Sequence, residues 1–213
     1  FAWSGLAEPN LMNAAGLLAG AFRAGDLPQR DWMGRHVPEA GDYQLVYDLD
    51  LTGLGPAIHY AVDNHAKIHQ PFDRIAYFVE LQDANDNSQD VFVSMDACTR
   101  DLAKIGVPVA GAGAFFQQDV TNLDVFSNVK GIVTGTGLSG GNIEFWPNNY
   151  AQPNSAGVPN ASSDDFDFGD QPTDPADGYG SMQVHNHDAR QTLFAINHWR
   201  EGTRTDIGIG NQP

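Results

Sequence analysis

Cysteine is nearly absent from this sequence: Cys98 is the single one among 213 residues. One thiol cannot form an internal disulfide, and it excludes the zinc sites that are built from several cysteines. The stretch "SMDACTR" is typical of the end of a strand that enters a turn, where a lone cysteine is commonly a small buried side chain. We therefore expect Cys98 to be structural, with a catalytic thiol as the alternative.

Basic residues are also scarce. Lys and Arg number 11 against 27 Asp and Glu, which gives a formal net charge of −16. The sequence shows no basic surface that would displace counterions from nucleic acid or from an anionic membrane, so we expect neither as a partner. Because no run approaches the ~18 apolar residues of a membrane helix, we expect no membrane insertion. The acidic excess is compatible with Ca²⁺ binding and with solubility in salt.

Helical periodicity is limited to the first residues, where "NLMNAAGLLAGAFRAG" places apolar side chains at helical spacing. Three glycines weaken that pattern, so residues 1–41 are interpreted as an irregular or helical lead-in segment. From residue 42 onward the period changes to two, and Gly- and Asn-rich connections separate the segments. We predict strands at 43–51, 74–82, 90–97, 131–137, 142–147, 180–187 and 191–199.

Short strands with hairpin-like connections and long loops predict an all-β domain over residues 42–213. The expected architecture is an antiparallel β-sandwich of the jelly-roll type. The longest connection covers about 32 residues between "NIEFW" and "GSMQV", a length typical of functional loops or disorder.

A candidate ligand face follows the strand in "YGSMQVHNHD". Alternation directs Met182 and Val184 to one face and the side chains of Tyr179, Gln183, His185 and His187 to the other. In "NIEFW" the same alternation places Glu144 and Trp146 together. Rings offer apolar platforms and planar polar groups offer fixed hydrogen bonds, a mixture that suits sugars. A buried polar network beneath a covering loop is the alternative.

Both the histidines and the acidic loops contain residue types that bind metal ions. An H-x-H pair such as His185 and His187 puts two rings on one face of a strand, yet no spacing nominates a third zinc ligand. For Ca²⁺ the candidates are two oxygen-rich loops, "DANDN" and "DDFDFGD" (Asp164, Asp165, Asp167 and Asp170), and we name Asp83, Asn85 and Asp86 of the first as the oxygen ligands. Ordinary turns rich in Asp and Asn are the alternative.

One enzymatic alternative comes from the triplet Gln183, Val184 and His185. It is similar to the Q-[IV]-H strand motif of jelly-roll alginate lyases, in which the Gln neutralises a uronate and the His, with a Tyr, moves the proton. By this resemblance Tyr179, Gln183 and His185 would be catalytic. The R-[TS]-E-L-R and Y-F-K-A-G strands of those lyases are absent from the sequence.

A wider resemblance covers about 170 residues, from about Asp42 onward. Its most specific parts are "GNIEFWPNNY" and "GYGSMQVHN", within a series that runs from "PFDRIAYFVELQ" to "DIGIGN". This series resembles a poorly characterised β-sandwich accessory module of secreted bacterial proteins labelled sialate O-acetylesterase. The resemblance implies an accessory domain that binds carbohydrate, beside a catalytic domain in the full-length protein.

The leading hypothesis is therefore a non-catalytic carbohydrate-binding module of an extracellular polysaccharide-processing protein. Its expected partner is a polysaccharide or glycan, its expected place is extracellular, cell-surface or periplasmic, and its one expected cofactor is a structural Ca²⁺. A polysaccharide lyase that acts by β-elimination on uronates is the alternative, and a structural or adhesive domain is a third possibility.

Overall fold

The computed structural model describes residues 2–5, 31–49, 60–82, 87–106, 116–146, 179–199 and 205–210. Strands dominate these residues, and the strand pairings are antiparallel, so the chain is all-β as predicted. The chain divides into two compact units. Unit 1 comprises residues 1–48, 61–106 and 122–138, and unit 2 comprises residues 49–60, 107–121 and 139–213.

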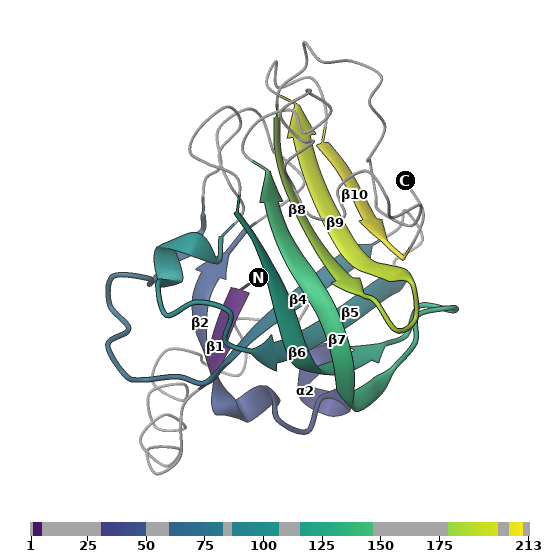
Figure 1. The fold of residues 1–213 in the computed structure, drawn as a ribbon, viewed down its shortest axis with the longest axis horizontal. Helices are drawn as coiled ribbons and strands as arrows, with labels where there is room; N and C mark the ends of the chain where they lie inside the picture. The colour runs from purple at the N-terminus through teal and green to yellow at the C-terminus, as the bar shows by residue number, and fades with distance from the viewer. Residues whose placement is uncertain are drawn as a thin grey trace. The chain divides into compact units, whose positions relative to one another are not determined.

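Unit 1 contains six strands in the hydrogen-bonded order β6-β5-β4-β1-β2-β3. Their bounds are β1 Ala2–Gly5, β2 Tyr43–Asp48, β3 Val62–Asp63, β4 Arg74–Gln82, β5 Ser88–Asp96 and β6 Phe116–Ser127, of which residues 122–127 belong to this unit. Figure 1 shows β4 and β5 as long neighbouring strands, paired from Arg74 opposite Asp96 to Gln82 opposite Ser88. Both strands are buried on both faces at their centres.

A short helix covers one face of this sheet. Helix α2 (Asp31–His36) is followed by the 3₁₀ turn η2 (Ala40–Asp42). Trp32 of α2 stacks on Phe78 at 6.1 Å between ring centroids. The resulting hydrophobic cluster contains Met33, Val37, Tyr43, Leu45, Ala76, Phe78 and Phe92. Truncating either buried Phe to Ala typically costs about 3–5 kcal/mol, so this cluster is a main source of stability for unit 1.

The opposite face is covered by the segment around the 3₁₀ turn η4 (Leu102–Lys104). Two buried tyrosines attach it: the Tyr47 hydroxyl donates to the Leu102 carbonyl at 3.1 Å, and the Tyr77 hydroxyl donates to the Ile105 carbonyl at 3.1 Å. Tyr47 reaches this face because the register between β1 and β2 shifts at Ala2 and Trp3. One extra residue in a strand reverses the side-chain alternation beyond it.

Unit 2 contains four strands in the order β10-β9-β8-β7. Their bounds are β7 Gly135–Trp146, of which residues 139–146 belong to this unit, β8 Tyr179–Asn186, β9 Gln191–Trp199 and β10 Thr205–Ile209. In Figure 1 strands β8, β9 and β10 run side by side, as their pairings require. Met182, Val184 and Ile143 are buried as the alternation predicted.

The expected lead-in over residues 1–41 contributes elements to unit 1. Strand β1 pairs with β2 and β4, and α2 packs on the sheet through Trp32 and Met33. The expected helix near residues 10–25 lies outside the described residues. The predicted strand at 131–137 was partly wrong, because residues 129–131 form a bend and a turn, residues 132–134 are irregular, and β7 begins at Gly135.

Candidate functional site

The candidate ligand face on β8 is a buried polar layer. Gln183 is 2% exposed and His185 is 0% exposed, although sequence alternation placed both on a face that a saccharide could reach. Their neighbours in the ladder are buried as well: Asn142 lies opposite His185 and is 0% exposed. The expectation of accessible side chains was wrong for Gln183 and His185, because this strand is buried on both faces. His187, just beyond the strand, is half-buried.

Hydrogen bonds tie this polar layer together. Thr192 Oγ1 lies 3.2 Å from His185 Nδ1, and His187 Nε2 donates to Asn142 Oδ1 at 2.6 Å. Burial, assisted by repulsion from His187, lowers the pKa of His185 to about 3. An imidazole with that pKa stays neutral at physiological pH, so it is a weak base for abstracting a proton from a polysaccharide. The arrangement fits the alternative of a buried polar network.

The other predicted residues of this face are described only in part. The backbone places Glu144 opposite Gln183, Trp146 opposite Ser181, and Tyr179 opposite Trp199. The side chains of Glu144, Trp146 and Tyr179 lie outside the described part of the structure.

The predicted calcium ligands Asp83, Asn85 and Asp86 also lie outside the described residues, between β4 and β5. Among the residues that are described, no group of three or more His, Cys, Asp or Glu side chains could hold a metal. Beside the loop, Asp90 on β5 is 0% exposed and lies opposite Glu80. Its Oδ2 accepts from Ser88 and Asn128, at 2.6 Å each.

The second oxygen of that buried carboxylate, Asp90 Oδ1, has no hydrogen-bond partner among the described residues. A buried acceptor without a partner costs free energy, since water no longer solvates it. Among the described residues, Asp90 is thus the buried carboxylate nearest in sequence to the predicted calcium ligands.

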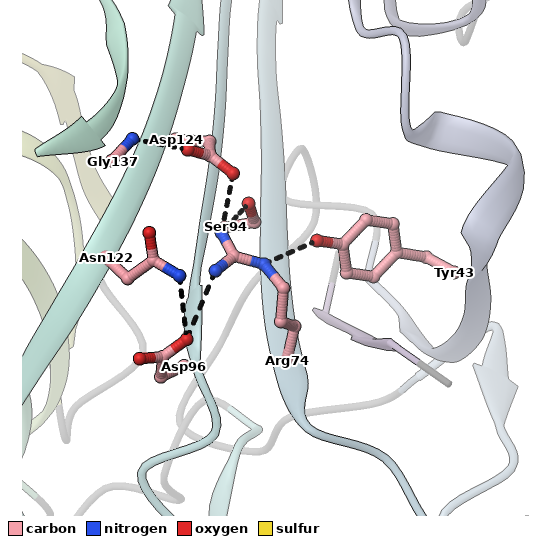
Figure 2. Close-up of polar contacts among 7 residues, drawn as sticks. All are labelled: Tyr43, Arg74, Ser94, Asp96, Asn122, Asp124 and Gly137. Atoms are coloured by element: carbon pink, nitrogen blue, oxygen red, sulfur yellow. Dashed lines mark hydrogen bonds and ion pairs between the residues drawn. The ribbon is translucent and has the colours of Figure 1, made fainter. Parts of the chain in front are cut away.

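A second polar cluster surrounds Arg74, at the opposite end of β4 from Glu80. Figure 2 shows its guanidinium between the Tyr43 hydroxyl on one side and side chains of β5 and β6 on the other. Arg74 Nε donates to Tyr43 at 3.3 Å, and Nη1 donates to Asp96 at 3.2 Å. Nη2 donates to Ser94 at 2.7 Å and to Asp124 at 2.8 Å.

Further bonds close this cluster. Asn122 Nδ2 donates to Asp96 at 3.0 Å, and the Gly137 amide donates to Asp124 at 2.7 Å. Gly137 has a φ of +64°, a conformation that favours glycine. Burial raises the pKa of Tyr43 despite its bonds to Ser94 and Arg74, and burial also raises the pKa of nearby Glu39. Because the guanidinium donors are occupied by protein, we interpret the cluster as a cross-link between strands.

The feature best suited to a ligand is an open hollow of about 620 Å³ within unit 1. It lies between the segment 65–73 and the segment 100–103, and its lining includes His65, His69, Gln70, Phe72, Arg100 and Asp101. Sites for small molecules commonly have volumes of about 300–1,000 Å³. The hollow is therefore large enough for a small ligand.

Backbone anchors fix both walls of the hollow. On the first wall, the Asn64 side chain donates to the Leu45 carbonyl at 3.2 Å, and the Asn64 amide donates to the Val46 carbonyl at 2.8 Å. On the second wall, Asp101 caps η4 by accepting from the Ala103 amide at 3.1 Å. Together with the tyrosine bonds to η4, these anchors hold the two walls on one sheet, so the hollow exists before any ligand arrives.

The floor of the hollow combines a ring with a cation. Phe72 is 6% exposed, and the Arg100 guanidinium lies over its ring at 5.4 Å from the centroid. His65 stacks on Tyr47 at 5.8 Å, and its Nδ1 lies 2.5 Å from Asp63 Oδ1. Burial acts to raise the pKa of Asp63, but hydrogen bonds from His65 outweigh it and the pKa is lowered.

Sequence reasoning missed this hollow because its residues come from loops without periodicity. His65 and His69 stand out in "HYAVDNHAKIH", but nothing in the sequence brings Arg100 to Phe72. The half-buried Cys98 precedes the second wall, and burial raises the pKa of its thiol to about 11. A thiol that stays protonated at neutral pH is a weak nucleophile, in agreement with a structural role.

No protein-family model, curated protein or solved structure matches this chain at a significant level. The resemblance to an accessory module of secreted bacterial proteins therefore stays a prediction from the residues. Within the described ranges, no helix has the length and apolar character that a membrane crossing requires.

Proposed function

We propose that this chain is a non-catalytic carbohydrate-binding module and that the hollow of unit 1 is its binding site. One observation carries the proposal: an open hollow of about 620 Å³ brings together the planar polar side chains of His69, Gln70 and Arg100, with the buried Phe72 ring beneath the Arg100 guanidinium. Planar polar groups supply directed hydrogen bonds to the hydroxyl rim of a pyranose, and the apolar side chains of Ile68 and Pro71 in the lining supply surface for its CH face.

The availability of those polar groups supports the proposal. Among the described residues, neither His69 nor Gln70 has a hydrogen-bond partner for its side chain, and both are at least partly exposed. A donor without an acceptor in the protein can form a hydrogen bond to a ligand, and no existing hydrogen bond has to be broken first. By contrast, the guanidinium of Arg74 is occupied and Gln183 is buried.

The wider setting belongs to the same proposal. We place the module in an extracellular polysaccharide-processing protein, on a jelly-roll β-sandwich scaffold with a structural Ca²⁺ in the loop that contains Asp83. The antiparallel all-β architecture supports the scaffold, and the resemblance of "GNIEFWPNNY" and "GYGSMQVHN" supports the setting. The lyase alternative is less well supported, because it needs His185 as a proton carrier and that imidazole is buried.

A glycan array followed by calorimetric titration tests the binding site. We expect His69→Ala and Gln70→Ala to weaken binding of the best array ligand by about 5- to 10-fold each, the loss of roughly one hydrogen bond. Lys130→Ala, an exposed substitution in the turn before β7, is the matched control and should bind like the wild type. Unchanged affinity in both variants would show that the binding site lies elsewhere. Formation of an unsaturated product during incubation would instead favour the lyase.

A further inference from the structure

We infer that the ligand of this hollow is an acidic saccharide, one that bears a carboxylate or a sulfate, and that Arg100 is its specificity-determining residue. The inference rests on the proposed function and adds the chemical class of the ligand. It starts from Arg100, which is exposed and makes one described contact, with the face of the Phe72 ring.

The guanidinium of Arg100 keeps its hydrogen-bond donors available. Within the described residues it has no hydrogen bond and no ion pair, and the hollow's two carboxylates, Asp73 and Asp101, do not form one with it. The contact with the Phe72 ring is a cation–π contact, which occupies none of the guanidinium N–H groups with a protein acceptor. The planar edge of a guanidinium matches the two oxygens of a carboxylate or sulfate in a bidentate pair.

An arginine without an ion-pair partner is unusual in a chain with this charge balance. Acidic residues outnumber basic ones by 27 to 11, so an arginine could easily find a carboxylate partner. Arg74 in the same unit has two, Asp96 and Asp124. Arg100 instead lines the hollow, where its guanidinium contacts the Phe72 ring.

The acidic residues of the lining do not cancel this cation. Asp101 is already used: its Oδ1 accepts from the Ala103 amide and its Oδ2 lies 3.9 Å from Lys104 Nζ. Asp73 is exposed at the edge of β4, where water screens its charge. The neighbouring donors of His69 and Gln70 are available for the remaining oxygens of an acidic sugar. The hollow therefore offers a cation, unpaired within the described part of the chain, beside the side-chain donors of His69 and Gln70.

A matched pair of ligands tests the inference: an oligogalacturonide and its fully methyl-esterified form, in which each carboxylate is replaced by a neutral ester. Sulfated and neutral oligosaccharides complete the panel. For the full chain in calorimetry at low salt, we expect the acidic member of a pair to bind at least tenfold more tightly. That preference should shrink as the NaCl concentration rises, because ions screen an exposed pair.

Substitutions of Arg100 test whether this residue causes the preference for acidic ligands. Arg100→Gln should weaken binding of the acidic ligand by about 10- to 100-fold, as expected for charge-assisted hydrogen bonds, and should weaken binding of the neutral ligand by no more than the 5- to 10-fold expected for His69→Ala and Gln70→Ala. Arg100→Lys keeps the charge but loses the planar edge, so it should recover part of the loss. Lys130→Gln removes an exposed charge elsewhere in unit 1 and should bind like the wild type.

The outcomes separate this inference from the proposed function. Equal affinity for acidic and neutral ligands, lost in His69→Ala, would overturn the acidic preference and keep a carbohydrate site. An acidic preference that survives Arg100→Gln would overturn the role of Arg100. The absence of binding to every saccharide in the panel, with folding verified by circular dichroism, would overturn the proposed function itself.

Discussion

His185 lies in unit 2 with none of its surface exposed, and burial holds its pKa near 3. The unfolded chain has an ordinary histidine pKa of about 6.5. Above that pH the imidazole is neutral in both states and this residue adds no pH dependence. As the pH falls below 6.5, the unfolded state takes up a proton that the folded state excludes, so the free energy of unfolding decreases until about pH 3.

We therefore expect unit 2 to lose stability on mild acidification. Between pH 7 and pH 5 the contribution of His185 amounts to about 2 kcal/mol, at roughly 1.4 kcal/mol per pH unit. Urea unfolding at several pH values should show a shallower decrease for His185→Gln, which cannot titrate. Parallel pH profiles for the two proteins would contradict the shifted pKa, as would an imidazole NMR signal of His185 that titrates near pH 6.5.

Arg74, unlike His185, is a charged side chain whose hydrogen bonds and ion pairs stabilise the fold. It is 20% exposed and donates to Tyr43, Ser94, Asp96 and Asp124, so removing it takes a donor from each partner, although Asp96 still accepts from Asn122 and Asp124 still accepts from the Gly137 amide. We expect Arg74→Met to lower the free energy of unfolding by about 2–4 kcal/mol, since the partners stay partly buried.

Asp96→Asn is the internal control for that prediction. Asp96 is 51% exposed, so water already screens its pair with Arg74, and the loss should stay below about 1 kcal/mol. Denaturant unfolding measures both changes. Equal losses for the two variants would show that the cluster is a surface ion pair and not a buried cross-link.

The prediction of secondary structure from sequence succeeded where alternation was strong and failed where it was weak. The expected segments 74–82 and 191–199 coincide with β4 and β9. Strand β6 was missed because "FQQDVTNLDVFS" carries polar residues on both faces, and Asn122 within it has a positive φ of 56°. Helix α2 has six residues, too few for a 3.6-residue period to show.

The candidate site was harder to predict than the strands. Alternation states which side chains share a face, but not whether another part of the chain covers that face. This is why Gln183 and His185 were grouped correctly and yet are buried. The hollow depends on Tyr47 changing face at a register shift and on Arg100 meeting Phe72, and neither leaves a periodic signal.

The η4 segment tests whether the hollow is held in place by the sheet. Tyr47→Phe and Tyr77→Phe each remove one buried hydroxyl and the hydrogen bond to a carbonyl of this segment. We expect each substitution to lower the free energy of unfolding by about 1 kcal/mol. Ligand affinity should also fall severalfold, because the Arg100 wall would have to be ordered on binding.

Two measurements check this prediction: denaturant unfolding and calorimetric titration with the same saccharide. Burial raises the pKa of Tyr47 to about 12, so the ultraviolet titration of Tyr47→Phe should lack a tyrosine that ionises near pH 12. Unchanged stability and affinity in both variants would show that η4 is held by other contacts.

The loop between β4 and β5 tests the calcium hypothesis. If Asp83, Asn85 and Asp86 bind calcium as predicted, about 10 mM Ca²⁺ should stabilise the fold by about 1.4 kcal/mol or more, given constants typical of extracellular modules. EDTA should reverse the rise in melting temperature, and Asp83→Asn should reduce it. An equal effect of Mg²⁺, or none of Ca²⁺, would contradict a calcium site here.

At the scale of the whole molecule, the net charge of −16 opposes compactness by self-repulsion. Salt screens that repulsion, so we expect the melting temperature to rise between about 20 mM and 200 mM NaCl, where the Debye length falls from roughly 20 Å to below 10 Å. The melting temperature of Arg74→Met should rise at least as much as that of the wild type. A melting temperature that falls with salt would show that attractive ion pairs outweigh the repulsion.

Strands β6 and β7 each begin in one unit and end in the other, so unit 1 is assembled from three separate stretches of chain that reach residue 138. During synthesis, β4 and β5 must wait for residues 124–127 to leave the ribosome before Phe92 meets Phe126. Such distant pairings slow folding. No single cut releases either unit intact, so fragments for biochemical work should retain both.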